Sequence, residues 1–371
     1  MPRAVIMTAA DEPLQVVSLD IAPLGADQVR LAMAAAGVCH SDLHVYNAGA
    51  PGIFRPLVLG HEGAGEVIEV GANVTEVAVG DHVVLSGITQ CGECGFCVSG
   101  QPTLCAAFPT MRTGALPDGS RPLSLDGEPV GQMGGVGCWT EEAVVHWRSA
   151  VKIDQDMPLV PAALLGCGVI TGFGAVANVG RVRAGDTMAV IGCGGLGLSA
   201  IQAGRIAGAE RIIAVDVNPG KLALAARSGA TDVVNAADGD PVEQVRALTG
   251  GAGTMFAFDF VGVPETARNG LAMTRPGGTL VLSGLGAAEL TFSINELIRA
   301  GRTIKGNFAG MGTFGPEFAK LIKHYQDGAL QLDALVSKQL DLSEVQLALD
   351  SMSDGAVARS VLVMAGPRGT V

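Results

Sequence analysis

Residues 187–197, TMAVIGCGGLG, decide the fold of this 371-residue chain. An apolar run typical of a strand leads directly into a GxGxxG turn, and an alanine-rich helical pattern follows over 195–208. Glycines in such a turn let the backbone approach a pyrophosphate, and the free N–H groups of the helix start attract its charge. The alternative is a glycine-rich packing turn. The context favours a dinucleotide site with cofactor-binding residues Gly192, Gly194, Gly195, Leu196 and Gly197.

Asp216 ends the next strand-like run, RIIAVD, and lies 19 residues beyond Gly197. An acid at this place accepts hydrogen bonds from the ribose hydroxyls and repels a 2′-phosphate. The sequence therefore predicts NAD rather than NADP as the cofactor.

The rest of the chain indicates two domains. Strands alternate with helical segments from about residue 186 to residue 306, which predicts an α/β fold with a doubly wound parallel sheet. Short strand-like runs broken by glycine and proline precede this block and predict a β-rich domain. The last apolar run, SVLVM at 360–364, has no partner within the α/β block. We therefore expect one domain over 1–167 and 307–371, and a dinucleotide-binding domain over 168–306.

Composition excludes several classes of function. Hydrophobic residues make up 48% and charged residues 16%, which favours a well-packed core over disorder. The net charge of −12 disfavours nucleic acid as a partner. Residues 159–180 carry no charge, but five glycines and a proline suit a packed interior better than lipid. The first residues, MPRAVIMTAADEPL, contain no apolar signal segment, so we expect no membrane association and a cytoplasmic location.

Four of the eight cysteines form a CxxCxxCx7C pattern. Their thiolates can close a tetrahedron around one zinc ion, and a closed set leaves no open position for chemistry. An iron–sulfur cluster is the alternative, but such patterns usually end in a shorter gap followed by proline. The pattern predicts a structural zinc site made of Cys91, Cys94, Cys97 and Cys105.

Three further candidate ligands are scattered: Cys39 in GVCHSDLH, His61 in LGHEGAG and Cys167 in LLGCGVITG. Each alone is more often an inert buried residue. Together they supply two thiolates and an imidazole, and zinc held by three protein ligands keeps a fourth position for substrate.

These motifs give the chain its family resemblance. GVCHSDLH, LGHEGAG, CGECGFCVSGQPTLC, LLGCGVITGFG, VIGCGGLG and AVDVN follow one another as in zinc-dependent medium-chain alcohol dehydrogenases. The segment PDGSRPLSLDGEPVGQMG resembles an insertion of the liver-type branch. The resemblance spans nearly the whole chain and implies a Rossmann domain, a GroES-like catalytic domain, NAD, and two zinc ions per subunit. It also implies a homodimer, with a tetramer as the alternative.

The resemblance assigns a role to each site residue. It makes Cys39, His61 and Cys167 the ligands of the catalytic zinc, with Glu62 as a nearby carboxylate and Asp42 orienting the His61 ring. Ser41 would bind the alcohol and pass its proton toward His44, and Thr171 would lie beside the nicotinamide. Many relatives have arginine where His40 stands, so His40 should hold the pyrophosphate less firmly. The remaining residues implied to bind pyrophosphate and ribose are Lys221 and Arg359.

The implied activity is reversible oxidation of alcohols to aldehydes with hydride transfer to NAD. Family pocket positions correspond to Gly87, Trp139 and Phe308. Because relatives often carry a ring where Gly87 stands, we expect bulky aromatic or medium-chain primary alcohols as substrates.

Two alternatives stay open. One is a formaldehyde dehydrogenase branch that depends on glutathione or another thiol. Residues 106–109 lack that branch's arginine, and segment 45–59 lacks its acids. The other alternative is a non-catalytic zinc- and NAD-binding relative.

Overall fold

The computed structural model describes residues 1–48, 52–88, 90–286, 289–353 and 357–364. The chain forms two compact units. Unit 1 contains Met1–Cys167, Thr313–Lys323 and Leu332–Val371, and unit 2 contains Gly168–Gly312 and His324–Gln331.

The second boundary between the units differs from the expected one after residue 306. Residues 307–312 and 324–331 group with unit 2. Hydrogen bonds explain the difference, because the Asn307 N–H donates to the Leu282 carbonyl at 2.8 Å. In addition, the Gln331 N–H donates to Oε1 of Gln202 at 2.7 Å.

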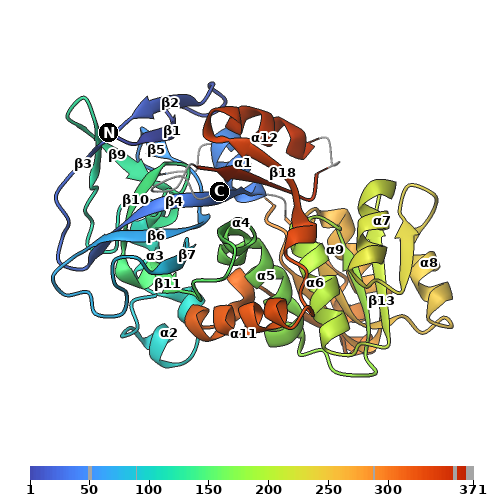
Figure 1. Cartoon of the computed structure of the whole chain (residues 1–371). Coiled ribbons are helices and arrows are strands. Elements are labelled where there is room, and N and C mark those ends of the chain that lie inside the picture. The colour runs from blue at the N-terminus through green and yellow to red at the C-terminus, as the bar shows by residue number, and fades with distance from the viewer. Residues whose placement is uncertain (49–51, 89, 287–288, 354–356, 365–371) are drawn as a thin grey trace. The chain divides into compact units, whose positions relative to one another are not determined.

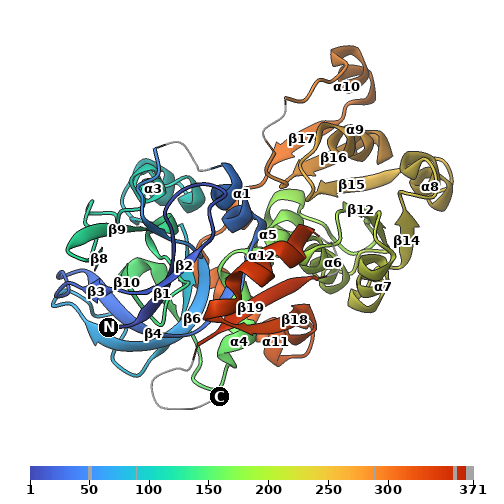
Figure 2. The same ribbon diagram turned by 90° about the horizontal axis from the view of Figure 1, so that it is seen from above.

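Unit 2 is built on a six-stranded sheet in the order β14-β13-β12-β15-β16-β17, and every neighbouring pair is parallel. Strands β15, β16 and β17 lie side by side in Figure 2. The strands span Thr187–Ile191 (β12), Arg211–Asp216 (β13), Asp232–Asn235 (β14), Thr254–Asp259 (β15), Thr274–Leu282 (β16) and Thr303–Gly306 (β17). This order confirms the doubly wound sheet, whose crossover point lies between β12 and β15.

Six α-helices connect or flank these strands among the described residues of unit 2: α5 (Gly168–Gly174), α6 (Gly195–Ile206), α7 (Pro219–Ser228), α8 (Pro241–Leu248), α9 (Pro264–Met273) and α10 (Ile294–Ala300). The central strands β12 and β13 are almost continuously apolar, since helices cover both faces of such a sheet. Buried residues such as Ile191, Ile213 and Leu280 form the shared core.

Unit 1 contains two mainly antiparallel sheets. One has the order β2-β1-β5-β9-β8-β3, and the other has the order β11-β7-β6-β4-β19-β18 with β10 also paired to β4. The long strand β4 is seen beside β6 and β10 in Figure 1. The strands span Arg3–Met7 (β1), Gln15–Ser18 (β2), Asp20–Ile21 (β3), Gln28–Val38 (β4), Leu57–Val58 (β5), Glu62–Val70 (β6), His82–Ser86 (β7), Leu123–Leu125 (β8), Glu128–Gln132 (β9), Glu142–His146 (β10), Ala150–Lys152 (β11), Val336–Asp341 (β18) and Arg359–Val363 (β19).

The last strand returns to unit 1 as the sequence predicts. β19 pairs antiparallel with β4, from Ser360 opposite Val38 to Val363 opposite Ala35. The helices of unit 1 are α1 (His40–Ala48), α2 (Gly95–Val98), α3 (Phe108–Arg112), α4 (Leu159–Ala163) and α12 (Val345–Ser353). Helix α11 (Phe314–Gln326) begins in unit 1, and its last residues belong to unit 2.

No single helix in the described part of the chain has the length and hydropathy of a membrane span. Leu159–Gly166 and Gly168–Gly180 meet that test only as a bent pair counted together. They coincide with the uncharged run at 159–180 noted in the sequence.

Candidate active site

The three scattered ligand candidates meet within unit 1. Cys39 follows β4, His61 precedes β6, and Cys167 follows a 3-10 turn at Leu164–Gly166. Their donor atoms all lie within 4.8 Å of one another, and Nε2 of His61 is 3.3 Å from Sγ of Cys167. Donors that share one tetrahedral zinc lie about 3.5 Å apart, given Zn–S near 2.3 Å and Zn–N near 2.0 Å. The arrangement therefore fits zinc, with one coordination position free.

Asp42 forms hydrogen bonds to the segments of two of these ligands, Cys39 and His61. Its buried carboxylate accepts the Cys39 N–H at 2.9 Å through Oδ2 and the Gly60 N–H at 3.1 Å through Oδ1. The same Oδ1 is 3.0 Å from Nδ1 of His61, which leaves Nε2 facing the metal position. The predicted orienting residue thus also fixes the backbone on both sides of the site.

The electrostatics of the site favour the thiolate form of its ligand Cys39. A hydrogen bond from Cys167 is the main cause that lowers the pKa of Cys39 well below its ordinary value, although burial opposes it. A lowered pKa means that the thiolate of Cys39 is stabilised, and the thiolate is the form that binds zinc. Burial lowers the pKa of His61, but the charge and hydrogen bond of Asp42 raise it to about 10 overall.

Glu62 and Arg359 form a buried ion pair next to the ligands. Oε1 of Glu62 bonds Nη2 of Arg359, and the two side chains are 0% and 5% exposed. Space is tight here, since a Cβ at Gly37 would lie 2.7 Å from Cδ of Glu62. Nε of Arg359 is buried without a hydrogen-bond partner among the described residues. The pyrophosphate role of Arg359 stays a prediction.

The expected proton relay lies on α1. Oγ of Ser41 is 3.9 Å from Sγ of Cys39, so this hydroxyl lies directly at the metal site. His44 is three residues further along the helix, on the same side as Ser41, and is exposed. His40 is exposed at the start of the same helix.

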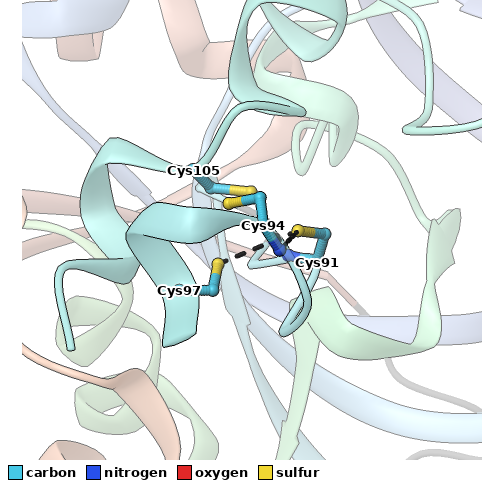
Figure 3. A group of neighbouring side chains, drawn as sticks. All are labelled: Cys91, Cys94, Cys97 and Cys105. Atoms are coloured by element: carbon cyan, nitrogen blue, oxygen red, sulfur yellow. Dashed lines mark hydrogen bonds between the residues drawn. The ribbon is translucent and has the colours of Figure 1, made fainter. Parts of the chain in front are cut away.

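The second metal site is the four-cysteine cluster. Figure 3 shows Cys91, Cys94, Cys97 and Cys105 converging from the loop and short helix α2. Sγ of Cys91 is 3.9 Å from Sγ of Cys97, close to the roughly 3.8 Å expected for two thiolates on one zinc. The set matches a closed structural zinc site.

Backbone N–H groups support the four sulfurs. Cys91 N–H donates to Sγ of Cys105 at 3.3 Å, Cys94 N–H donates to Sγ of Cys91 at 3.3 Å, and Ala107 N–H donates to Sγ of Cys105 at 3.4 Å. Such donors offset the negative charge of thiolates. A hydrogen bond from the Ala106 backbone is the main cause that lowers the pKa of Cys94 to about 6.

The dinucleotide turn of unit 2 has the geometry that its glycines permit. Gly192 adopts a φ of +89°, and a Cβ on Gly197 would overlap the Gly192 carbonyl oxygen. Gly194 precedes α6 without a side-chain cap, so the N–H groups at the helix start stay available to a pyrophosphate.

Asp216 holds the same turn. Its Oδ2 accepts the Cys193 N–H at 2.7 Å, and its Oδ1 accepts the Asn218 N–H at 2.9 Å. Lys221 lies in the first turn of α7, whose start is capped by Asn218. The carboxylate that should bind the ribose therefore also fixes the glycine turn against the end of β13.

Thr171, expected beside the nicotinamide, is nearly buried in α5. Nδ2 of Asn307 donates to the Thr171 carbonyl at 3.1 Å and to Oγ of Ser283 at 2.8 Å. Sequence reasoning missed Asn307, because nothing in its local pattern shows that it connects α5 to the end of the sheet.

The three expected pocket residues have different surroundings. Gly87 is buried, and a Cβ there would lie 2.9 Å from Cβ of His61. Phe308 is half-buried in unit 2. Trp139 is 0% exposed, and its indole N–H donates to the Gly37 carbonyl at 3.2 Å. The expectation that Trp139 is a pocket wall is therefore wrong for this structure, since a side chain with no accessible surface is a core residue.

Two cysteines without an expected role are buried thiols. Burial raises the pKa of Cys138 well above its ordinary value, and burial together with the charge of Asp216 raises that of Cys193 to about 12. Both stay protonated and unreactive near neutral pH.

Comparison with known proteins identifies the family. Residues 25–155 match the alcohol dehydrogenase GroES-like domain, and residues 195–327 match the zinc-binding dehydrogenase domain. The chain belongs to the zinc-dependent medium-chain alcohol dehydrogenases, which are oxidoreductases that use zinc and NAD.

Individual relatives align over almost the whole chain. An S-(hydroxymethyl)glutathione dehydrogenase of Synechocystis sp. is 37% identical over 97% of this chain and 99% of its own. A putative alcohol dehydrogenase D of Mycobacterium tuberculosis is 38% identical to this chain, and the alignment covers 97% of this chain and 99% of the relative. The crystal structure of benzyl alcohol dehydrogenase from Acinetobacter calcoaceticus superposes with a TM-score of 0.93 at 32% identity, covering 98% of this chain and 99% of that one.

We expect the Asp216→Gly variant to lose its preference for NAD over NADP by roughly ten- to hundredfold, because a hydrogen bond to a charged group contributes about 1.5–3 kcal/mol. The substitution removes the acceptor of the ribose hydroxyls and the like charge that repels a 2′-phosphate. Titrating each dinucleotide by quenching of tryptophan fluorescence measures the ratio. Asp232→Asn, on the neighbouring strand, is the matched control. Equal affinity of the unaltered protein for NAD and NADP would contradict this role.

Proposed function

We propose that this protein oxidises primary alcohols to aldehydes, reversibly, at the site formed by Cys39, His61 and Cys167. The observation that carries the proposal is the convergence of two thiols and one imidazole, whose donor atoms lie within 4.8 Å of one another. Three protein ligands leave a position for the substrate oxygen, whereas the four-cysteine site is closed.

When bound, zinc supplies a Lewis acid that acidifies the alcohol, and NAD supplies the hydride acceptor. The residues of the chain position and deprotonate the substrate. Ser41, beside Cys39, would accept a hydrogen bond from the alcohol hydroxyl and take up its proton while giving its own hydroxyl proton onward toward His44. The exposed His44 would pass that proton to solvent. Asp42 would keep the His61 ring in one orientation throughout.

The proposed substrates are bulky aromatic or medium-chain primary alcohols. The family resemblance assigns pocket positions to Gly87 and Phe308, and a phenylalanine ring would offer such substrates an apolar face. The similarity to a protein named benzyl alcohol dehydrogenase also supports this substrate class. Because the backbone of Gly87 lies against His61, any side chain there would displace a zinc ligand, and specificity is better tested at Phe308.

We expect kcat/KM to rise roughly ten- to hundredfold from ethanol to hexanol or benzyl alcohol, since each buried methylene contributes up to about 0.8 kcal/mol. Phe308→Ala should reduce this rise mainly by lowering kcat/KM for benzyl alcohol. The control is Phe256→Ala, which removes a half-buried ring stacked on Phe258 in the same unit. A parent protein that oxidises ethanol as efficiently as benzyl alcohol would contradict the proposed substrate class.

A thiol-dependent formaldehyde dehydrogenase is the second candidate, because several relatives are named S-(hydroxymethyl)glutathione dehydrogenase. The sequence disfavours it, since residues 106–109 are AAFP and segment 45–59 contains no acid. Assaying formaldehyde with glutathione beside benzyl alcohol separates the two activities.

We also propose that the protein is a homodimer assembled through unit 2. β17 is an edge strand among the described strands of its sheet and offers unpaired backbone groups. Ile294 and Ile298 are one helical turn apart on α10 and are 74% and 72% exposed. A second copy covering this strand and helix would pair the edge and bury both isoleucines. None of the eight cysteines, all of which the structure describes, forms a disulfide, in keeping with the expected cytoplasmic location.

Replacing both isoleucines by aspartate should convert the dimer into a monomer, because two charges cannot be buried in an apolar interface without partners. Sedimentation velocity measures the change. Leu347→Asp, at an exposed leucine of unit 1, should leave the dimer intact. An unaltered protein that sediments as a monomer at micromolar concentration would contradict the proposal.

A further inference from the structure

We propose that Trp139 is a positioning residue that holds the Cys39 and His61 segments in register for zinc binding. The inference rests on the proposed function only in taking these residues as ligands of the catalytic zinc. The indole N–H donates to the Gly37 carbonyl at 3.2 Å, two residues before Cys39 on β4. The side chain has no exposed surface, so water cannot replace this contact.

Trp139 also contacts the segment that carries His61. The Trp139 N–H donates to the Leu59 carbonyl at 3.0 Å, and the neighbouring Cys138 N–H donates to the Gly60 carbonyl at 3.0 Å. Gly60 has a φ of +86°, and a Cβ there would overlap Cδ1 of the indole. The ring therefore lies directly against the residue that precedes the histidine ligand.

Gly60 is consequently fixed on three sides. Asp42 accepts its N–H at 3.1 Å, Cys138 donates to its carbonyl, and the indole blocks its Cα. Asp42 also accepts the Cys39 N–H, so Asp42 and Trp139 connect the same two ligand segments through different atoms. A metal site tolerates only about 0.5 Å of error in its ligands, which makes two such restraints useful. Cys167 lies on a third segment, outside this pair of restraints.

The test measures zinc release to a chromophoric chelator from the full-length zinc protein. Its two sites should release zinc in separate phases, and the Cys167→Ala variant, which lacks one ligand, identifies the phase of the catalytic zinc. We expect Trp139→Phe to accelerate that phase about ten- to hundredfold, the usual effect of removing a residue that supports a metal ligand. The phase of the four-cysteine site should not change. Trp147→Phe, at the only other tryptophan, is the matched control.

A spectroscopic measurement separates positioning from a purely structural role. With cobalt(II) in the catalytic site, the visible bands report the ligand geometry, and we expect them to shift in Trp139→Phe but not in Trp147→Phe. Unchanged zinc release with unchanged bands would overturn the proposal. Equal acceleration of both phases would also overturn it, because Trp139 would then support only the fold of unit 1.

A second variant covers the case in which Trp139→Phe does not fold. Incorporating benzothienylalanine for tryptophan in the Trp147→Phe background removes the indole N–H and preserves the shape of the ring. The expected result is the same selective acceleration, and its absence would contradict the role of the Gly37 hydrogen bond. None of these measurements uses an alcohol, so a failure of the proposed substrate class would appear separately.

Discussion

Cys167→Ala is expected to lower kcat for alcohol oxidation by about a thousandfold or more while most of the fold is retained. Removing one of three protein ligands weakens zinc binding and eliminates several kcal/mol of charge stabilisation, and each 1.36 kcal/mol corresponds to tenfold in rate. Cys167 follows a short 3-10 turn at the end of the first segment of unit 1, so its loss does not interrupt a strand. Initial rates of NADH formation and zinc content per subunit measure the effect together.

Cys138→Ala is the matched control for this experiment. Cys138 is a buried thiol of unit 1 that belongs to neither group of metal ligands. It should keep two zinc ions and most of its turnover. A Cys167→Ala protein that retains normal rates with about one zinc per subunit would refute the assignment of the catalytic site.

Cys94→Ser should instead lower the thermal midpoint by roughly 5–10 °C, because losing a structural metal belongs to the few changes that cost about 3–5 kcal/mol. The four cysteines organise a segment with only the short helix α2 and a 3-10 turn, Pro102–Leu104, within it. Little apolar burial is available there to replace the metal, since α2 has no buried residue.

Differential scanning calorimetry with zinc analysis measures this second effect. Ser99→Ala, which removes a surface hydroxyl bonded to the Phe96 carbonyl in the same segment, should change the midpoint by less than about 2 °C. A Cys94→Ser protein with an unchanged midpoint and two zinc ions would show that the cluster is not a structural metal site.

Local patterns were sufficient to predict much of the fold. The GxGxxG turn, the acid at the end of β13 and the alternation of strands and helices predicted the parallel sheet, because each feature reflects a short-range requirement of the backbone. The metal sites were predictable for a similar reason. Cysteine is rare, so its spacing at 91–105 carries much information even without structure.

The sequence did not predict features that depend on distant contacts. Trp139 was interpreted as a pocket residue, but its surroundings depend on Gly37 and Gly60, which lie about 80 to 100 residues away in the chain. The sixth strand, β17, was not predicted, since its sequence TIKG lacks the apolar run of a buried strand. The sequence did not predict that residues 324–331 group with unit 2, because side-chain bonds such as that from Gln331 to Gln202 cannot be inferred from composition.

The most direct test of the central claim is the initial rate of NADH formation from benzyl alcohol and NAD by the protein purified with its zinc. The account predicts a saturable rate that disappears in Cys167→Ala, that needs about two zinc ions per subunit, and that exceeds the rate with ethanol. Protein that carries two zinc ions and binds NAD, but forms no NADH from benzyl alcohol, hexanol or ethanol, would contradict it.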